Sequence, residues 1–204
     1  REIPVLNAGS GADQHPTQAL LDVYTLQRSF ENIGGIDGKN IVFVGDLARG
    51  RTVRSLAWLL TLFDDVKLHF VAPEQLQIGD DILELLDAAG TEYHVTGDFD
   101  SVMADAVAIY MTRIQDEWYT EGGSTTEASD YHIGVEHMDT MKDHCAILHP
   151  LPRRQEVSTD IDNDPRAMSW RQMRIGMWIR AALILTTVHR EQEVHEYYDA
   201  YKPE

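Results

Sequence analysis

The chain has 204 residues, 43% of them hydrophobic, which suits one large domain or two small ones, and its formal net charge is −17. The single cysteine excludes a disulfide framework, and the acidic balance argues against nucleic acid or an anionic membrane surface as a partner. No apolar run reaches membrane-spanning length and no signal peptide is visible; because a disulfide framework is excluded, we expect a reducing, cytoplasmic setting.

The first predicted element is a helix over residues 16–32. Pro16 suits the first turn of a helix, and apolar residues follow at helical spacing. His15, Gln18 and Asp22 fall on a neighbouring stripe, at positions i, i+3 and i+7. This alignment marks His15 and Gln18 as candidates for function; the alternative is that His15 caps the helix and Gln18 is solvated. The apolar face is expected to comprise Ala19, Leu20, Val23, Gln27 and Phe30.

Five short apolar runs predict buried strands, and helical patterns separate them. Strands that are apolar on both faces and alternate with helices are typical of a parallel sheet covered by helices. We therefore predict one α/β domain over residues 1–204, with a doubly wound, mostly parallel, five-stranded, Rossmann-like sheet. The strands are expected at 40–46, 66–72, 91–97, 106–112 and 145–150. The helices between and after them are expected at 51–63, 80–90, 98–106, 133–142 and, as a long closing helix, 169–190.

The sequence also contains a loop-like stretch, an acidic tail and a single cysteine. The stretch 119–132 is rich in Gly, Ser and Thr, which predicts a loop. The acidic tail after residue 190 either continues the closing helix or frays. Cys145 lies in the apolar segment "HCAILHP", and we interpret it as a buried structural thiol.

Arginine accounts for thirteen of the seventeen basic residues, and several arginines follow predicted strands. In open α/β sheets, ligands bind beyond the carboxyl ends of the strands, so side chains that follow different strands meet at one edge. A guanidinium group matches the geometry of a carboxylate or phosphate. The pattern predicts an anion site at this edge, with surface salt bridges as the alternative. The arginines concerned are Arg49, Arg51, Arg54, Arg113, Arg153 and Arg154.

Two of the loops beyond the strands carry candidate anion ligands. The loop "GDLARGRT" precedes a helix whose first N–H groups favour an anion, and Arg51 is its best candidate for holding a carboxylate. The loop has neither the dinucleotide fingerprint nor the P-loop pattern. In "TRIQ", Arg113 and Gln115 are two positions apart, so they share one side of an extended chain.

The third loop, "HPLPR", contains two prolines. Pro150 and Pro152 flank Leu151 and fix the backbone, and one of the X-Pro bonds is a candidate for the cis form. A rigid turn of this kind can present carbonyl oxygens to an amine. We expect His149 to be a packed residue at the end of the strand and not a catalytic one.

Four segments together resemble the second half of the aspartate carbamoyltransferases. They are "NAGSGADQHPTQALLDVYTL", "VGDLARGRTVRSL", "MTRIQDE" and "LHPLPRRQEV", in the order and at roughly the spacing of that family. The resemblance runs from about Pro4 to Leu185, and four linked motifs are more specific than any one alone. The related ornithine enzymes typically carry His-Cys-Leu-Pro where this chain has "HPLP", so aspartate is the better prediction of the substrate.

The resemblance implies transfer of the carbamoyl group from carbamoyl phosphate to the amino group of L-aspartate, without a metal or an organic cofactor. His15 and Gln18 match positions that face the carbonyl of carbamoyl phosphate, where a donor stabilises the charge of the attacked oxygen. The positions that match the aspartate site are Arg51, Arg113 and Gln115, with Pro150 and Leu151 in a turn that has a cis Leu151–Pro152 bond.

The resemblance also implies a partner domain and an assembly. Helix 16–32 would link two domains, and the carbamoyl-phosphate domain, with its Ser-Thr-Arg-Thr motif, is absent from these 204 residues. We expect a homotrimer, with regulatory chains or another pyrimidine-pathway enzyme as candidate partners. The alternatives are a transcarbamylase for another amino acid such as ornithine, and a non-catalytic homologue that scaffolds a partner enzyme. The intact set of candidate residues speaks against the latter.

Overall fold

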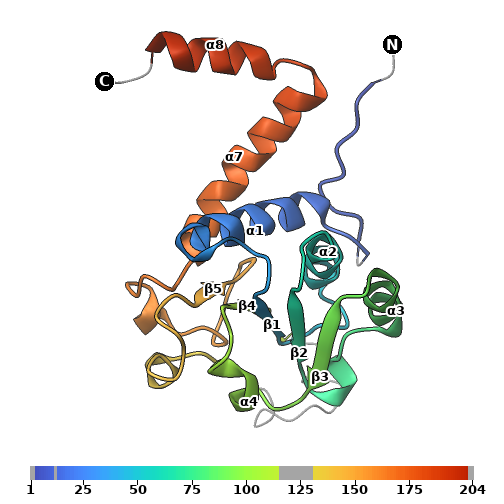
Figure 1. Ribbon diagram of the computed structural model, residues 1–204, viewed down its shortest axis with the longest axis vertical. Coiled ribbons are helices and arrows are strands. Elements are labelled where there is room, and N and C mark those ends of the chain that lie inside the picture. The colour runs from blue at the N-terminus through green and yellow to red at the C-terminus, as the bar shows by residue number, and fades with distance from the viewer. Residues whose placement is uncertain (1–2, 12, 115–130, 202–204) are drawn as a thin grey trace.

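A parallel sheet forms the centre of the molecule (Figure 1). The computed structural model describes residues 3–11, 13–114 and 131–201. Its five strands are all parallel and lie in the order β3-β2-β1-β4-β5. The predicted fold class is therefore confirmed. The strands are β1 (Asn40–Val44), β2 (Lys67–Val71), β3 (Glu92–Thr96), β4 (Ala108–Met111) and β5 (Ala146–Leu148).

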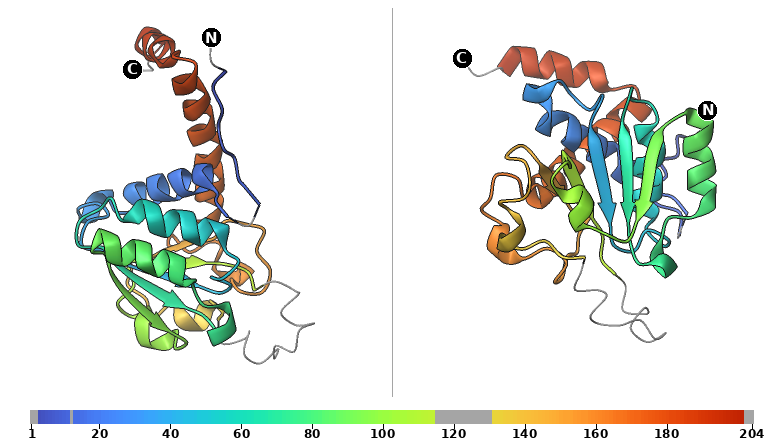
Figure 2. Two further views of the ribbon diagram at one scale, coloured as in Figure 1. Left: turned by 90° about the vertical axis from the view of Figure 1, so that its right-hand side faces the viewer. Right: turned by 60° about the horizontal axis from the view of Figure 1, so that its bottom comes forward.

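Helices cover the sheet on both faces (Figure 2, left). β1, β2 and β3 follow one another outward, and right-handed crossovers place α2 and α3 on one face. The chain then returns to β4 beside β1, and the same rule places α4 on the opposite face. The helices are α1 (Pro16–Ser29), α2 (Arg51–Leu60), α3 (Asp80–Ala89), α4 (Asp100–Met103), α7 (Ser169–Thr187) and α8 (Glu191–Tyr201).

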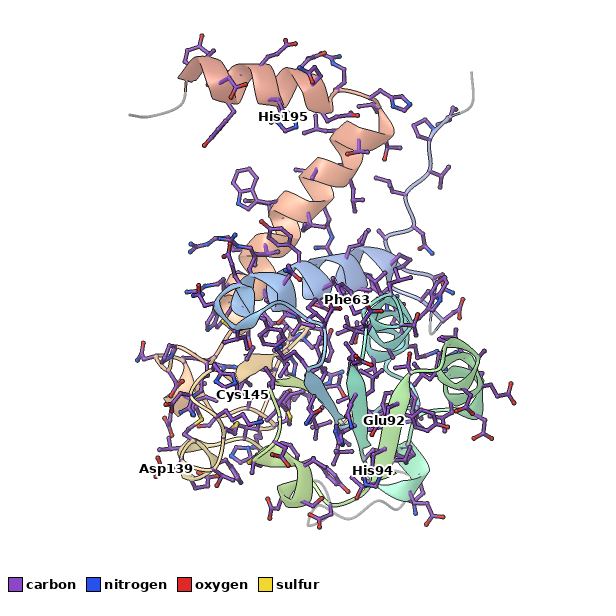
Figure 3. The ribbon with its side chains drawn as sticks, viewed as in Figure 1. Phe63, Glu92, His94, Asp139, Cys145 and His195 are labelled. Carbon is purple, nitrogen blue, oxygen red and sulfur yellow. The ribbon has the colours of Figure 1, made fainter. Side chains whose placement is uncertain are left out.

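The central strands are buried on both faces, which explains their uninterrupted apolar runs. The Phe43 ring stacks on Phe70 with centroids 5.4 Å apart, and it meets the Tyr110 ring at 5.8 Å. Cys145 lies beside the start of β5 and is buried (Figure 3). Burial raises the pKa of the Cys145 thiol to about 12, so the thiol stays protonated at neutral pH. This environment supports the interpretation of Cys145 as a structural thiol.

The buried face of α1 differs from the predicted one. α1 packs against both α2 and α7. Leu20, predicted to be buried, is 38% exposed, whereas Gln18, Asp22 and Thr25 are buried. These polar residues are inside because they make hydrogen bonds there. α1 is therefore a helix with a polar buried stripe between two apolar contacts.

Two of the predicted helices between strands are much shorter in the structure. Segment 133–142 contains only a 3₁₀ turn at Val135–His137, because tertiary contacts occupy its backbone. The Arg166 guanidinium donates to the carbonyls of Met138 and Met141, and Ile133 bridges to Val157. The helix predicted at 98–106 is confined to α4.

The predicted closing helix is divided in two. α7 ends at Thr187, and a left-handed residue, His189 with φ of 56°, turns the chain into α8. The tail is thus a second helix, and α7 and α8 project from the sheet (Figure 1). The predicted loop 119–132 lies almost wholly outside the described residues. Within the described part of the chain, no helix is both long enough and apolar enough to cross a membrane.

Candidate active site

A cavity of about 510 Å³ opens beyond the carboxyl ends of β1, β4 and β5. The strand order reverses between β1 and β4, and such a switch point is where open α/β sheets bind ligands. The loops that follow three different strands therefore meet at one place, as predicted. The lining residues are Gly11, Asp46, Arg49, Gly50, Arg51, Thr52, Thr112, Arg113, His149, Pro150, Leu151 and Pro152.

Gly45 makes the close approach of β1 and β4 possible at this point. Its φ of +113° lies in the region that side chains rarely adopt. A Cβ at this position would lie 2.2 Å from the carbonyl oxygen of Thr112. Thr112 in turn donates its backbone N–H and its hydroxyl to the carbonyl of Val44, at 2.8 and 2.9 Å. The floor of the cavity is thus tightly fixed.

Arg51 stands at the first position of α2 and faces the N-terminal segment. Its Nη1 donates to the carbonyl of Gly11 at 3.0 Å. Gly9 lies so close that a Cβ there would be 2.9 Å from the same nitrogen. The segment before α1 therefore passes over Arg51 and forms one wall of the cavity.

The arginines divide into two groups. Arg49, Arg51 and Arg113 line the cavity, and Arg49 Nη1 lies 3.9 Å from Oδ2 of Asp46, the acidic residue of the described lining. Arg54 instead pairs with Asp81, and this contact lowers the pKa of the Asp81 carboxyl. The salt-bridge alternative is correct for Arg54, and the anion-site prediction places Arg51 and Arg113 together as expected. The cavity is cationic although the chain carries a net charge of −17.

Arg153 also belongs to the paired group. It bonds the Asp162 carboxylate through both terminal nitrogens and lies over the Trp170 ring at 5.7 Å. The hydrogen bonds from Arg153 lower the pKa of Asp162. Arg153 therefore braces the chain after the proline turn and does not line the cavity.

The proline turn is held by the side chain of His149. Leu151 has φ of 55°, and the predicted cis Leu151–Pro152 bond is present. The Leu151 N–H donates to His149 Nδ1 at 2.9 Å, so the ring proton resides on Nε2, which donates to Glu156 Oε1 at 2.8 Å. Burial would raise the pKa of Glu156, but the bonds from His149 and from the Arg154 N–H outweigh it and lower that pKa. His149 is a packed residue at the strand end, as predicted, and its ring joins the Leu151 N–H to the Glu156 carboxylate.

His15 is the N-cap residue of α1, and its carbonyl accepts the N–H groups of Gln18 and Ala19, but its side chain does not cap the helix. Its side chain makes no capping hydrogen bond, and its backbone N–H donates to Ser55 Oγ at 2.9 Å. The ring Nδ1 is buried without a hydrogen-bond partner among the described residues. Burial, and then the positive charges of Arg51 and Arg180, lower the pKa of His15. His15 is therefore a neutral imidazole with an unused ring nitrogen, and the capping alternative is wrong.

Gln18 is buried, so the alternative of a solvated side chain is also wrong. Its Nε2 donates to Asp22 Oδ1 at 2.9 Å. Neither His15 nor Gln18 is among the residues that line the cavity described above. Gln115 lies outside the described residues.

Sequence reasoning missed two groups at the site. Asp46 is 1% exposed and accepts the Arg49 N–H at 3.0 Å, which shapes the loop before α2. Its position directly after a strand was the available signal. Gln172 on α7 contacts the turn only through tertiary structure, and nothing in its local sequence marks it.

Comparison with known proteins adds the family. The family model described as "Aspartate/ornithine carbamoyltransferase, Asp/Orn binding domain" matches residues 37–187. The model described as "Aspartate/ornithine carbamoyltransferase, carbamoyl-P binding domain" matches residues 1–28, a segment that includes most of α1.

Individual relatives of the chain are also aspartate carbamoyltransferases. The chain is 46% identical over 184 residues to aspartate carbamoyltransferase 1 of Pisum sativum, covering 89% of this chain and 47% of the relative. It is 43% identical over 182 residues to the aspartate carbamoyltransferase catalytic subunit of Vibrio cholerae, covering 89% of this chain and 58% of that relative. The chain thus spans about half the length of the curated relatives that it matches.

Solved structures show the same likeness in three dimensions. The catalytic subunit of M. jannaschii aspartate transcarbamoylase superposes with a TM-score of 0.84 at 37% identity, covering 94% of this chain and 61% of that one. The enzyme of Trypanosoma cruzi gives 0.78 at 39% identity, covering 89% and 58%. With a matching model over residues 37–187, the chain belongs to the aspartate/ornithine carbamoyltransferase family.

Proposed function

We propose that this chain is the aspartate-binding half of an aspartate carbamoyltransferase. The complete enzyme transfers the carbamoyl group of carbamoyl phosphate to the amino group of L-aspartate and releases N-carbamoyl-L-aspartate and phosphate. The observation that carries the proposal is the cavity at the switch point, which gathers Arg51 and Arg113 with the Pro150–Leu151 turn. The product is a pyrimidine precursor, and this role also belongs to the proposal.

The cavity suits a ligand with two carboxylates and an amine. Arg51 and Arg113 can each offer a planar pair of donors to a carboxylate. The Leu151 N–H is already bonded to His149, so the turn has its carbonyl oxygens left to accept from an amine. Aspartate held in this way keeps its amine beside the turn, and most of the catalytic work is to position two anions together.

The reaction needs a hydrogen-bond donor for the attacked carbonyl. When the amine attacks, the carbonyl oxygen of carbamoyl phosphate gains negative charge, and a preorganised donor stabilises that charge. His15 is neutral and half-buried, and its ring Nδ1 has no hydrogen-bond partner among the described residues, so it can act as this donor. As the carbonyl re-forms, the bond between its carbon and the phosphate oxygen breaks, and phosphate leaves with the proton that the amine gives up.

Relatives support the substrate assignment. Solved structures of the Trypanosoma cruzi enzyme are complexes with carbamoyl phosphate, with aspartate and phosphate, and with carbamoyl aspartate and phosphate. These relatives are 40–41% identical to this chain. An arginine-lined cavity also disfavours the cationic side chain of ornithine.

Assembly and compartment are part of the same proposal. We propose a cytoplasmic homotrimer that contains a carbamoyl-phosphate-binding domain and associates with regulatory chains or another pyrimidine-pathway enzyme. Exposed apolar side chains on α7 and α8 supply surface for contact with the carbamoyl-phosphate-binding domain. They include Met173, Met177, Trp178, Ile184, Tyr197 and Tyr201.

The decisive experiment is an Arg113→Ala substitution in an enzyme that includes the carbamoyl-phosphate domain. A charged hydrogen bond contributes roughly 1.5–3 kcal/mol, so the aspartate KM should rise by about one to two decades while that for carbamoyl phosphate stays nearly unchanged. Arg54→Ala is the matched control, because Arg54 pairs with Asp81 at the protein surface and should leave both KM values unaltered.

The wild-type enzyme should carbamoylate aspartate and not ornithine in a panel of amines. Preferential carbamoylation of ornithine would refute the substrate assignment. No carbamoyl transfer to any amine would favour a non-catalytic scaffold.

A further inference from the structure

The carboxyl group of Asp22 lies between the two parts of the candidate site. Asp22 is on α1 and is 0% exposed. Its Oδ1 accepts from Gln18 Nε2 at 2.9 Å and from Gln172 Nε2 at 2.6 Å, and its Oδ2 accepts from the Tyr110 hydroxyl at 2.7 Å. Donors from α1, α7 and β4 therefore converge on one side chain.

The direction of the hydrogen bonds toward the proline turn follows from backbone groups. The His149 N–H donates to Gln172 Oε1 at 2.9 Å. Because a backbone N–H can only donate, the amide oxygen of Gln172 must face His149, and its amide nitrogen must face Asp22. The His149 ring then accepts the Leu151 N–H. A series of hydrogen bonds, buried as far as the His149 N–H and partly buried at Leu151, thus runs from Asp22 to the turn that lines the cavity.

The bond toward the other part of the site is equally directional. Gln18 and Asp22 are four residues apart on α1, so they share one face of the helix. The amide nitrogen of Gln18 faces Asp22, which turns its amide oxygen away from the carboxylate. The first turn of α1, which carries His15 and Gln18, is thereby tied to the same carboxyl group as the turn at Leu151.

We propose that Asp22 is a positioning residue for the carbamoyl-transfer site, because it holds the Gln18 amide with one bond and the His149–Leu151 turn, through Gln172, with another. The proposal rests on the function proposed above. Asp22 fixes the placement of α1 relative to the proline turn, so the group that faces the carbonyl and the group that receives the amine keep one separation. Such positioning matters because small misplacements of reacting groups cost large factors in rate.

The chemistry of the site also identifies a substitution that should preserve this role. Both glutamines bond Oδ1, and only Tyr110 bonds Oδ2. In Asp22→Asn the amide oxygen can accept from both glutamines, while its nitrogen donates to the Tyr110 hydroxyl, which can accept as well as donate. In Asp22→Leu both glutamines lose their acceptor.

The test uses four variants of an enzyme that includes the carbamoyl-phosphate domain. Gln172→Leu cuts the bond to the turn and should lower kcat/KM for aspartate about tenfold. Asp22→Leu should lower it further, and Asp22→Asn should recover it to within a few-fold of wild type. Thr25→Val is the matched control, because the buried Thr25 hydroxyl on the same helix bonds the Leu21 carbonyl at 2.7 Å and no side chain of the candidate site. That control should keep the wild-type kcat/KM.

Amide hydrogen exchange supplies a readout that does not depend on activity. In Gln172→Leu, the His149 and Leu151 N–H groups should exchange faster than in wild type, while those of β1 should not. Unchanged exchange at both groups together with unchanged kcat/KM would overturn the proposal. So would an Asp22→Asn enzyme as impaired as Asp22→Leu, because charge and not position would then be the requirement.

The experiment remains decisive if one variant does not fold or if the proposed function is wrong. If Asp22→Leu does not fold, Gln172→Leu and Asp22→Asn still decide the question. If the wild-type enzyme does not carbamoylate aspartate but the exchange at His149 and Leu151 responds as expected, the proposed function fails and the tie between Asp22 and the turn stands.

Discussion

The surroundings of His15 determine the protonation state of its imidazole. Burial, with Arg51 and Arg180 nearby, lowers the pKa of the imidazole, so it is neutral at pH 7 and can donate one proton in a hydrogen bond without carrying charge. We predict that His15→Ala lowers kcat by about 10²–10³ and changes either KM much less, because the donor acts on charge that develops in the transition state. His195→Ala, on the projecting helix α8, is the control (Figure 3). A normal kcat with a lowered melting temperature would show that His15 is only structural.

Asp22 should make stability depend on pH. Burial raises its pKa to about 7 from an ordinary value of 3.8, although the bonds from Tyr110, Gln172 and Gln18 oppose the shift. The folded state therefore holds a proton that the unfolded chain releases. The stabilisation is complete below the unfolded pKa of about 3.8 and is lost as the pH rises through about 7.

We predict that wild type loses stability relative to Asp22→Asn by about 2–3 kcal/mol between pH 5 and pH 8. The asparagine does not titrate, and the two proteins share every other ionisable group, so the difference isolates Asp22. Thermal or denaturant unfolding of this chain measures it. A difference that stays constant across this pH range would mean that Asp22 is ionised throughout.

At the scale of residues, the sequence indicated where arginines gather but not which of them pair with carboxylates in the described part of the chain. Arg51 and Arg113 follow different strands, so the sheet topology brings them to one cavity. Arg54 and Arg153 follow strands too, but Asp81 and Asp162 neutralise them. Those partners are reached through tertiary folding, which a local pattern does not reveal.

The packing of β1 against β4 depends on the absence of a side chain at Gly45. Its φ of +113° and the 2.2 Å approach of a Cβ to the Thr112 carbonyl mean that any side chain would push β1 and β4 apart. We predict that Gly45→Ala costs more than about 3 kcal/mol, since backbone strain and a main-chain clash add. Gly90→Ala is the control: its φ is +72°, with nothing within 4 Å of a new Cβ, and it should cost about 1 kcal/mol. Equal losses in denaturant unfolding would refute the role of the close approach.

The elements themselves were predictable to different degrees. The central strands β1 and β4 were found because burial on both faces leaves continuous apolar runs, whereas the edge strand β3 is exposed or half-buried and was not the buried strand that we predicted. The helix expected at 133–142 is wrong because Arg166, more than twenty residues away, takes the Met138 and Met141 carbonyls. The break at His189 was missed because it needs a left-handed residue that is not glycine.

The whole molecule combines a buried sheet with two helices that project from it. Figure 2 (left) shows that α7 begins beside α1 and that its later part and α8 stand clear of the sheet layer. The apolar side chains that they expose, such as Met177 and Trp178 at 58% and 65%, have no cover from the described parts of this chain. Because the chain spans about half of its curated relatives, the domain that binds carbamoyl phosphate is the cover we propose.

The last prediction concerns the chain alone. It holds the residues proposed to bind aspartate, but the resemblance places the Ser-Thr-Arg-Thr motif that binds the phosphate of carbamoyl phosphate on the other domain. Without that motif the two substrates do not meet in one site, and the advantage of holding them together is lost. We predict that these 204 residues alone give negligible carbamoyl aspartate, and that joining them to a carbamoyl-phosphate-binding domain of the family restores turnover. The same fusion carrying Arg113→Ala controls for activity brought by the added domain and should remain slow at low aspartate. Substantial turnover by the chain alone, measured as product formed per mole of folded protein, would contradict a site shared between two domains.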